Sequence, residues 1–124
     1  MDISRLRGIK VLIVEDNKIT VRILNRMLSR WNCEVVGAVD TGEDAVQLFP
    51  SLRPDVILLD IGLAGEIDGM EAARRIRVRS VVPIIFLTAS PDNITDLDLK
   101  STPCFSKQGF DSRSLSVTML KVLK

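Results

Sequence analysis

The sequence predicts an α/β fold in which helices cover both faces of a parallel β-sheet. Short apolar blocks rich in β-branched residues alternate with segments whose apolar residues recur at helical spacing. Parallel strands need crossover connections, and these are nearly always right-handed. Strand and helix alternate five times along the chain, so we expect a five-stranded sheet.

Five short apolar blocks are the expected strands. They cover Lys10 to Val14 (KVLIV), Glu34 to Val39 (EVVGAV), Asp55 to Leu59 (DVILL), Pro83 to Leu87 (PIIFL) and a weaker Cys104 to Ser106 (CFS). A strand buried on both faces favours such runs. The third block leads directly into Asp60, and an unpaired acid at the tip of a buried strand is a liability unless its charge has a use.

Helical spacing marks the segments that follow the strands. Apolar residues recur in this way at Leu24, Met27, Leu28 and Trp31, at Ala45, Leu48 and Phe49, at Met70, Ala73 and Ile76, and at Leu115, Met119, Val122 and Leu123. Helix-capping residues stand before them: Asn17, Thr41, Asp68 with Glu71 three residues later, and Asp111. The fourth helix falls in residues 90–103, where two prolines and three aspartates leave few apolar contacts, so we expect it to be short or mobile.

Length and composition limit the class of protein. The chain has 124 residues, of which 46% are hydrophobic, so one compact domain spanning 1–124 is expected. Lys and Arg number 17 against 16 Asp and Glu, and the net charge of +1 gives no electrostatic reason to expect nucleic acid or an acidic membrane as a direct partner. The apolar stretch VLIV near the start is too short for a signal peptide or a membrane span.

Polar residues stand at the ends of four expected strands. Glu15 and Asp16 follow the first strand, Asp60 ends the third, Thr88 ends the fourth, and Lys107 ends the fifth. The carboxyl ends of parallel strands share one edge of the sheet, and ligands of open α/β sheets bind there. These five side chains are therefore expected to converge on one site.

The charges of this group predict a metal site with phosphoryl chemistry. Carboxylates a few ångströms apart repel by roughly 4 kcal/mol per pair at an effective dielectric constant near 20, so they must protonate or hold a cation. Oxygen ligands with room for water and phosphate suit Mg²⁺. An aspartate beside Mg²⁺ and a lysine can attack a phosphoryl group and form an acyl phosphate. This chemistry gives the charge of Asp60 a use.

Four segments together resemble the receiver domain of two-component response regulators. VLIVEDN is similar to that family's first strand with its acidic pair, and DVILLDIGLAGEIDGMEAARRIR to its phosphoacceptor strand and third helix. FLTAS is similar to its Ser/Thr strand and FSKQGF to its lysine strand. The four occur in order across essentially the whole chain. The resemblance implies a flavodoxin-like (βα)5 three-layer sandwich with strand order 2-1-3-4-5.

The resemblance also implies a phosphorylation site and a metal site. Asp60 would accept a phosphoryl group from a phosphohistidine of a histidine kinase or a histidine phosphotransfer protein, since the chain itself contains no His. Asp16, Asp60 and the main-chain carbonyl of Gly62 would ligate Mg²⁺, with Mn²⁺ as a substitute. Glu15 would act mostly through a bound water.

Three further residues are expected at the phosphoryl group. Thr88 would hydrogen-bond one phosphoryl oxygen when the switch closes, and Lys107 would pair with another. Ala89 is small, as the family prefers, which leaves the phosphate reachable. Taken singly, Thr88 could be an ordinary β-branched strand residue and Lys107 an edge-strand charge. Likewise, Glu15 and Asp16 could simply favour the amino end of the first helix.

Two positions depart from the family pattern. Gln108 follows the lysine where the family usually has a proline, and a cis bond before Gln would cost about 2.5 to 4 kcal/mol, so a trans peptide is expected. Cys104 stands where the family commonly has a Tyr or Phe that moves on activation. Phe105 points to the opposite face of the strand, where a core role is expected.

The two cysteines are expected to be reduced thiols of a cytoplasmic protein. In the implied strand order, Cys33 begins the strand at one edge and Cys104 the strand at the other, roughly 19 Å apart at about 4.8 Å per strand. A disulfide needs Cα atoms within about 7 Å. Reduced thiols are typical of the cytoplasm.

The leading interpretation is a Mg²⁺-dependent phosphoacceptor switch that controls a downstream effector protein or domain. It would catalyse its own aspartyl phosphorylation and dephosphorylation without acting as an independent turnover enzyme. The alternative is a phosphorylation-independent interaction module with a receiver fold. A free-standing phosphatase or phosphotransferase is disfavoured, since no second acid stands two residues after Asp60. The sequence leaves a homodimer open.

Overall fold

One parallel sheet of five strands organises the protein. The computed structural model describes residues 2–63, 65–89, 102–108 and 111–123. The strands are β1 (Lys10–Val14), β2 (Glu34–Val39), β3 (Val56–Asp60), β4 (Ile84–Thr88) and β5 (Cys104–Ser106). Their order in the sheet is β2-β1-β3-β4-β5, and every neighbouring pair is parallel. The predicted α/β class and strand order are confirmed.

Two strands lie one residue further along the chain than their apolar runs indicate. Pairing in β3 extends through Asp60, which lies opposite Leu87, and pairing in β4 extends through Thr88, which lies opposite Ser106. At the other end, Pro83 has no N–H to give to the ladder. Asp60 and Thr88, which were predicted to end these strands, are therefore their last paired residues.

The described helices begin where the capping residues predict. They are α1 (Lys18–Arg30), α2 (Gly42–Leu52), α3 (Gly69–Arg79) and α4 (Ser112–Val122), with a 3₁₀ turn, η1 (Ile3–Leu6), near the start. Side chains of Asn17, Thr41, Asp68 and Asp111 each accept a hydrogen bond from a main-chain N–H of the first turn. The expected helix within residues 90–103 lies almost entirely outside the described residues.

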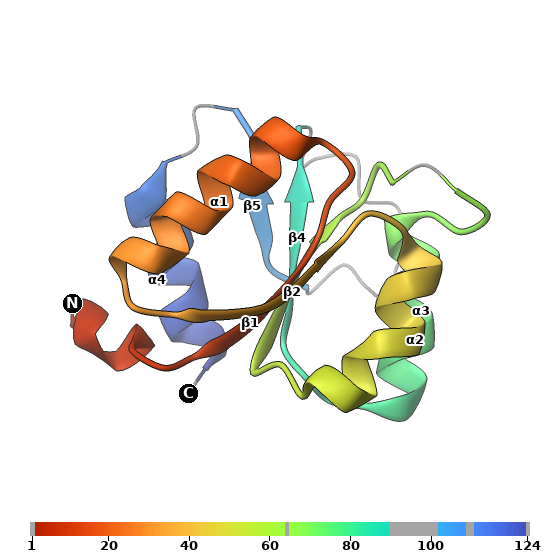
Figure 1. Ribbon diagram of the computed structural model, residues 1–124, viewed down its shortest axis with the longest axis horizontal. Coiled ribbons are helices and arrows are strands. Elements are labelled where there is room, and N and C mark those ends of the chain that lie inside the picture. The colour runs from red at the N-terminus through yellow and green to blue at the C-terminus, as the bar shows by residue number, and fades with distance from the viewer. Residues whose placement is uncertain (1, 64, 90–101, 109–110, 124) are drawn as a thin grey trace.

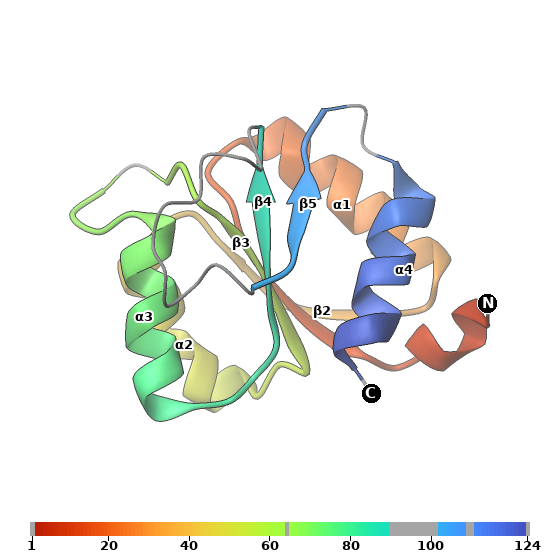
Figure 2. The ribbon, with the colours of Figure 1, turned by 180° about the vertical axis from the view of Figure 1, so that it is seen from behind.

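Helices form a layer on each side of the sheet. Figure 1 shows α1 and α4 on one side and α2 and α3 on the other, and Figure 2 shows the same three layers from behind. All residues of β3 and β4 are buried, because both faces are covered. The core on the α1–α4 side includes Ile13, Leu24, Leu28, Leu58 and Leu115. The core on the α2–α3 side includes Leu12, Phe49, Ile57, Ile76 and Phe86.

No helix in the described part of the chain is both long enough and apolar enough to cross a bilayer.

Gly69 lets α3 start directly against the end of β3. A Cβ at this position would lie 2.0 Å from the carbonyl oxygen of Asp60 and 2.7 Å from Cα of Ile61. The N–H of Gly69 donates to the carbonyl of Ile61 over 3.1 Å, so the two backbones are in contact. Only glycine fits this approach, and it fixes the start of α3 relative to Asp60.

Replacing Gly69 with Ala is expected to destabilise the fold. The new methyl group would collide with main-chain atoms that cannot move aside as a side chain can, so we expect a loss of about 1 to 3 kcal/mol or more in the free energy of unfolding. Urea unfolding measures this loss. Gly62→Ala is the matched control, because among the described residues a Cβ there would meet only Oδ1 of Asp60, at 3.7 Å. Equal unfolding midpoints for the two variants would contradict the expectation.

Candidate functional site

A cavity of about 470 Å³ opens at the carboxyl edge of the sheet. It is lined by Glu15, Asp16, Asn17, Asp60, Ile61, Gly62, Thr88, Ala89 and Lys107. All seven residues predicted for the phosphorylation and metal sites are among them. The structure therefore brings together residues that are far apart in the sequence, as the strand order requires.

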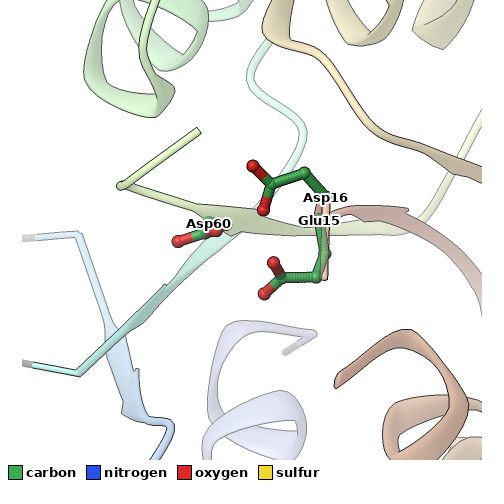
Figure 3. Close-up of side chains that lie close together, drawn as sticks. All are labelled: Glu15, Asp16 and Asp60. Carbon is green, nitrogen blue, oxygen red and sulfur yellow. The ribbon is translucent and has the colours of Figure 1, made fainter. Parts of the chain in front are cut away.

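Three carboxylates meet at the ends of β1 and β3. One oxygen from each of Glu15, Asp16 and Asp60 lies within 4.8 Å of the other two, and Figure 3 shows the three side chains together. Pairing of Val14 with Leu59 in adjacent strands places the next residues, Glu15 and Asp60, side by side. Their side chains are 0% and 7% exposed, whereas Asp16 is exposed. Two of the three charges are thus buried.

Lys107 places a positive charge between the two buried acids. Its Nζ lies 2.6 Å from Oε1 of Glu15 and 3.0 Å from Oδ2 of Asp60. The N–H of Lys107 donates to the carbonyl of Thr88 over 2.8 Å, which continues the β4–β5 ladder and fixes where the lysine leaves the sheet. The ammonium therefore balances part of the negative charge of the site.

Main-chain N–H groups bind the remaining carboxylate oxygens. Oε2 of Glu15 accepts from the N–H of Asn17 over 3.0 Å, and Oδ1 of Asp60 accepts from the N–H of Gly62 over 3.0 Å. Asn17 was predicted only as the cap of α1, and its side chain does accept from Ile19 and Thr20. Its second role, through the main chain, has no signal in the sequence beyond its position two residues after Glu15.

The environment changes the proton affinity of two groups. Burial raises the pKa of Glu15 to about 7, and neighbouring Asp60 adds to the rise, although hydrogen bonds from Lys107 and the N–H of Asn17 oppose it. Burial alone would lower the pKa of Lys107, but its hydrogen bonds to Glu15 and Asp60 outweigh this effect and raise the pKa. Lys107 is therefore charged at neutral pH, whereas the carboxyl of Glu15 titrates near neutral pH.

The acidic cluster fits a divalent cation. Oε1 of Glu15 is fully buried, and apart from the ammonium of Lys107 it has no hydrogen-bond partner among the described residues. An oxygen-only donor set with a carboxylate oxygen short of hydrogen bonds is what a hard cation such as Mg²⁺ or Mn²⁺ binds. Glu15, Asp16 and Asp60 could hold it.

The structure also describes the two positions that depart from the family pattern, Cys104 and Gln108. Phe105 is 2% exposed and belongs to the core on the α1–α4 side, as predicted, while Cys104 is half-buried and packs on the other side. None of the peptide bonds in the described segments is cis, which includes the bond before Gln108. Cys33 and Cys104 are both free thiols, near β2 and β5 at opposite edges of the sheet.

The raised pKa of Glu15 predicts that stability depends on pH in the metal-free protein. Folding raises the pKa of this carboxyl from 4.5 to about 7, so the folded state binds the extra proton between these values. Its stabilising contribution is complete below the unfolded pKa and is lost as the pH rises through the folded pKa. The whole shift corresponds to about 3 kcal/mol.

Urea unfolding in EDTA buffer at about pH 5 and about pH 8 tests this dependence. Wild type should lose stability relative to Glu15→Gln as the pH rises, because the variant cannot ionise at this position. The comparison between the two proteins cancels the contributions of other titrating groups. Parallel pH profiles would contradict a raised pKa at Glu15.

Comparisons with known proteins agree with this fold. A family model for the response regulator receiver domain matches residues 11–106. The signal receiver domain of modulated diguanylate cyclase from Desulfovibrio desulfuricans G20 is 32% identical, with 94% of each chain covered and a TM-score of 0.79. The REC domain of the PhyR response regulator from Erythrobacter litoralis is 26% identical, with 96% of this chain and 92% of that chain covered and a TM-score of 0.83.

A longer relative shows the same domain as part of a larger protein. The response regulator PhyR from Brucella abortus is 27% identical, with 98% of this chain covered and a TM-score of 0.83, and the match covers 50% of that chain. Receiver domains of this kind serve phosphorelay signalling and interact with kinases and with output or effector partners. With the family model matching most of its length, this chain belongs to the response regulator receiver family.

Proposed function

We propose that residues 1–124 form a single phosphoacceptor domain of a two-component phosphorelay. Asp60 takes a phosphoryl group from a phosphohistidine of a histidine kinase or a histidine phosphotransfer protein. The observation that carries this proposal is the carboxylate of Asp60 at the cavity, with the ammonium of Lys107 3.0 Å from Oδ2 and two further acids beside it. Such a group can act as a nucleophile towards phosphorus.

The transfer step needs one nucleophile and a balance of charge. A carboxylate oxygen of Asp60 attacks the phosphorus atom, the P–N bond to the donor imidazole breaks, and the ring nitrogen keeps the electron pair. An acyl phosphate forms on Asp60. A water molecule later attacks the phosphorus, the bond between phosphorus and the aspartyl oxygen breaks, and inorganic phosphate leaves the regenerated carboxylate. Lys107 stays charged throughout and offsets the negative charge of the transferred oxygens.

The acidic cluster supplies the metal ligands in this proposal. Asp16, Asp60 and the main-chain carbonyl of Gly62 hold Mg²⁺, or Mn²⁺ in its place, and Glu15 acts through a water. The bound ion supplies positive charge to the phosphoryl oxygens. Glu15 also keeps Lys107 in position through their 2.6 Å contact, which the sequence did not predict.

Phosphorylation controls a partner through the contacts that the new group makes. Thr88, the last residue of β4, hydrogen-bonds one phosphoryl oxygen, and Lys107 pairs with another. Ala89, which follows Thr88, is small and leaves the phosphoryl group accessible to other molecules. The phosphoryl group thereby favours the conformation in which these contacts form, and this conformation binds a downstream effector protein or domain. We place the protein in the cytoplasm, where free thiols such as Cys33 persist.

One observation favours a second candidate, an interaction module that works without phosphorylation. Cys104 occupies the β5 position where the family commonly has a mobile aromatic residue, and the neighbouring Phe105 is fixed in the core at 2% exposure. No aromatic side chain of β5 is therefore placed to move when Asp60 is modified. In this case the fold would present a constant binding surface.

Intact mass spectrometry after incubation with Mg²⁺ and acetyl phosphate separates the two candidates. We expect wild type to gain one phosphoryl group, because acetyl phosphate supplies the group without a protein partner. EDTA should prevent the gain, and Asp60→Asn should prevent it by replacing the nucleophile. An unmodified, folded wild type that also fails to bind Mg²⁺ would overturn the phosphoacceptor proposal in favour of the interaction module.

A further inference from the structure

The β3–α3 loop, residues 61–68, is tied to the first turn of α2 by a charged side chain. The main-chain N–H of Ile67 donates to Oε1 of Glu43, with 2.9 Å between nitrogen and oxygen. Hydrogen bonds to a carboxylate are roughly twice as strong as those between neutral groups. Within the described segments no cation pairs with Glu43, so this carboxylate serves the loop.

Close packing on both sides of this hydrogen bond restricts the positions that Ile67 and the side chain of Glu43 can take. Ile67 is 8% exposed, and a Cβ on Gly42 would lie 2.9 Å from its Cγ1, so the first turn of α2 accepts the isoleucine only because Gly42 has no side chain. Gly65 has a φ of +122°, and a Cβ there would lie 3.3 Å from Oε2 of Glu43. The carboxylate of Glu43 therefore lies along the loop backbone.

The same loop carries groups of the proposed phosphorylation site. The N–H of Gly62 donates to Oδ1 of Asp60, and the contact between Gly69 and Ile61 closes the base of the loop. Glu43 does not line the cavity at the carboxyl edge. The loop that both of them contact is therefore a structural connection between Glu43 and Asp60.

We propose that Glu43 is a positioning residue that holds the β3–α3 loop in the arrangement needed for Mg²⁺ binding beside Asp60. Its carboxylate fixes the backbone at Ile67, in the loop that also supplies the N–H of Gly62 to Asp60. The inference rests on the proposed function, because it assigns a role toward the same metal site. It adds a residue of α2, an element that contributes no side chain to the cavity lining.

Nuclear magnetic resonance on metal-free and Mg²⁺-titrated protein tests the role of Glu43. In Glu43→Ala, amide hydrogen exchange at Ile67 should become about tenfold faster, since a hydrogen bond to a charged group is lost. The Mg²⁺ concentration that half-saturates the shift of the Gly62 amide should rise by about threefold or more. In Glu43→Gln both values should stay within about twofold of wild type, because the amide oxygen still accepts from Ile67.

Asp44→Ala is the matched control. Asp44 lies in the same turn of α2, and with Glu15 and Asp16 it lines a neighbouring hollow, but no hydrogen bond joins its side chain to the described residues of the loop. If loss of charge were the cause, Asp44→Ala would weaken Mg²⁺ binding at least as much as Glu43→Ala, and that result would overturn the proposal. Faster exchange at Ile67 without weaker Mg²⁺ binding would overturn it as well, since Glu43 would then only stabilise the loop.

Two results distinguish failure of this inference from failure of the proposed function. A wild type that shows no Mg²⁺-dependent shift at Gly62 overturns the metal site itself, and with it the role of Glu43. If Glu43→Ala binds Mg²⁺ as tightly as wild type, the metal site remains supported and only the positioning role of Glu43 is overturned. Urea unfolding of each variant establishes that the compared proteins are folded.

Discussion

The structure depends on placing two buried carboxylates at the ends of adjacent strands. Glu15 and Asp60 are nearly inaccessible to solvent, and their charges would be strongly unfavourable without a partner. The partner, Lys107, comes from a strand three positions away from β1, about 14 Å across the sheet. Its long side chain reaches back over the end of β4 to both acids. The strand order is therefore a requirement of the site's electrostatics as well as of the core.

Local signals predicted the strands and the described α-helices of this fold, whereas several long-range contacts between side chains could not be predicted. The caps of the four described helices and the five apolar strands depend on neighbouring residues, so they could be identified from the sequence. The grouping of Glu15, Asp60 and Lys107 followed from the geometry of parallel strands and from family resemblance. The direct contact of Glu15 with Lys107 did not follow, because nothing in the sequence indicates whether an ammonium or a water meets that carboxylate. The turn η1 also carries no periodic pattern.

The loop after β3 combines two kinds of constraint. At its base, the absence of a side chain at Gly69 lets two backbones touch, which is a steric condition set by neighbours in the sequence. Further along, Ile67 is bound by Glu43, a residue 24 positions earlier in the chain. Pairs of this kind leave no periodic or compositional trace in the sequence. The packing of α2 against α3 brings them together, and it thereby connects the helical layer to the chemistry at the sheet edge.

The position of Lys107 also decides when the site becomes complete during biosynthesis. β5 is the last of the five strands in chain order, and it contributes only three residues at one edge of the sheet. The chain is synthesised from its N-terminus, so the residues of β1, β2 and β3 are made before those of β5. A chain that lacks β5 also lacks the ammonium that balances part of the charge of Glu15 and Asp60. The charge balance of the centre is therefore complete only after the final strand has joined the sheet.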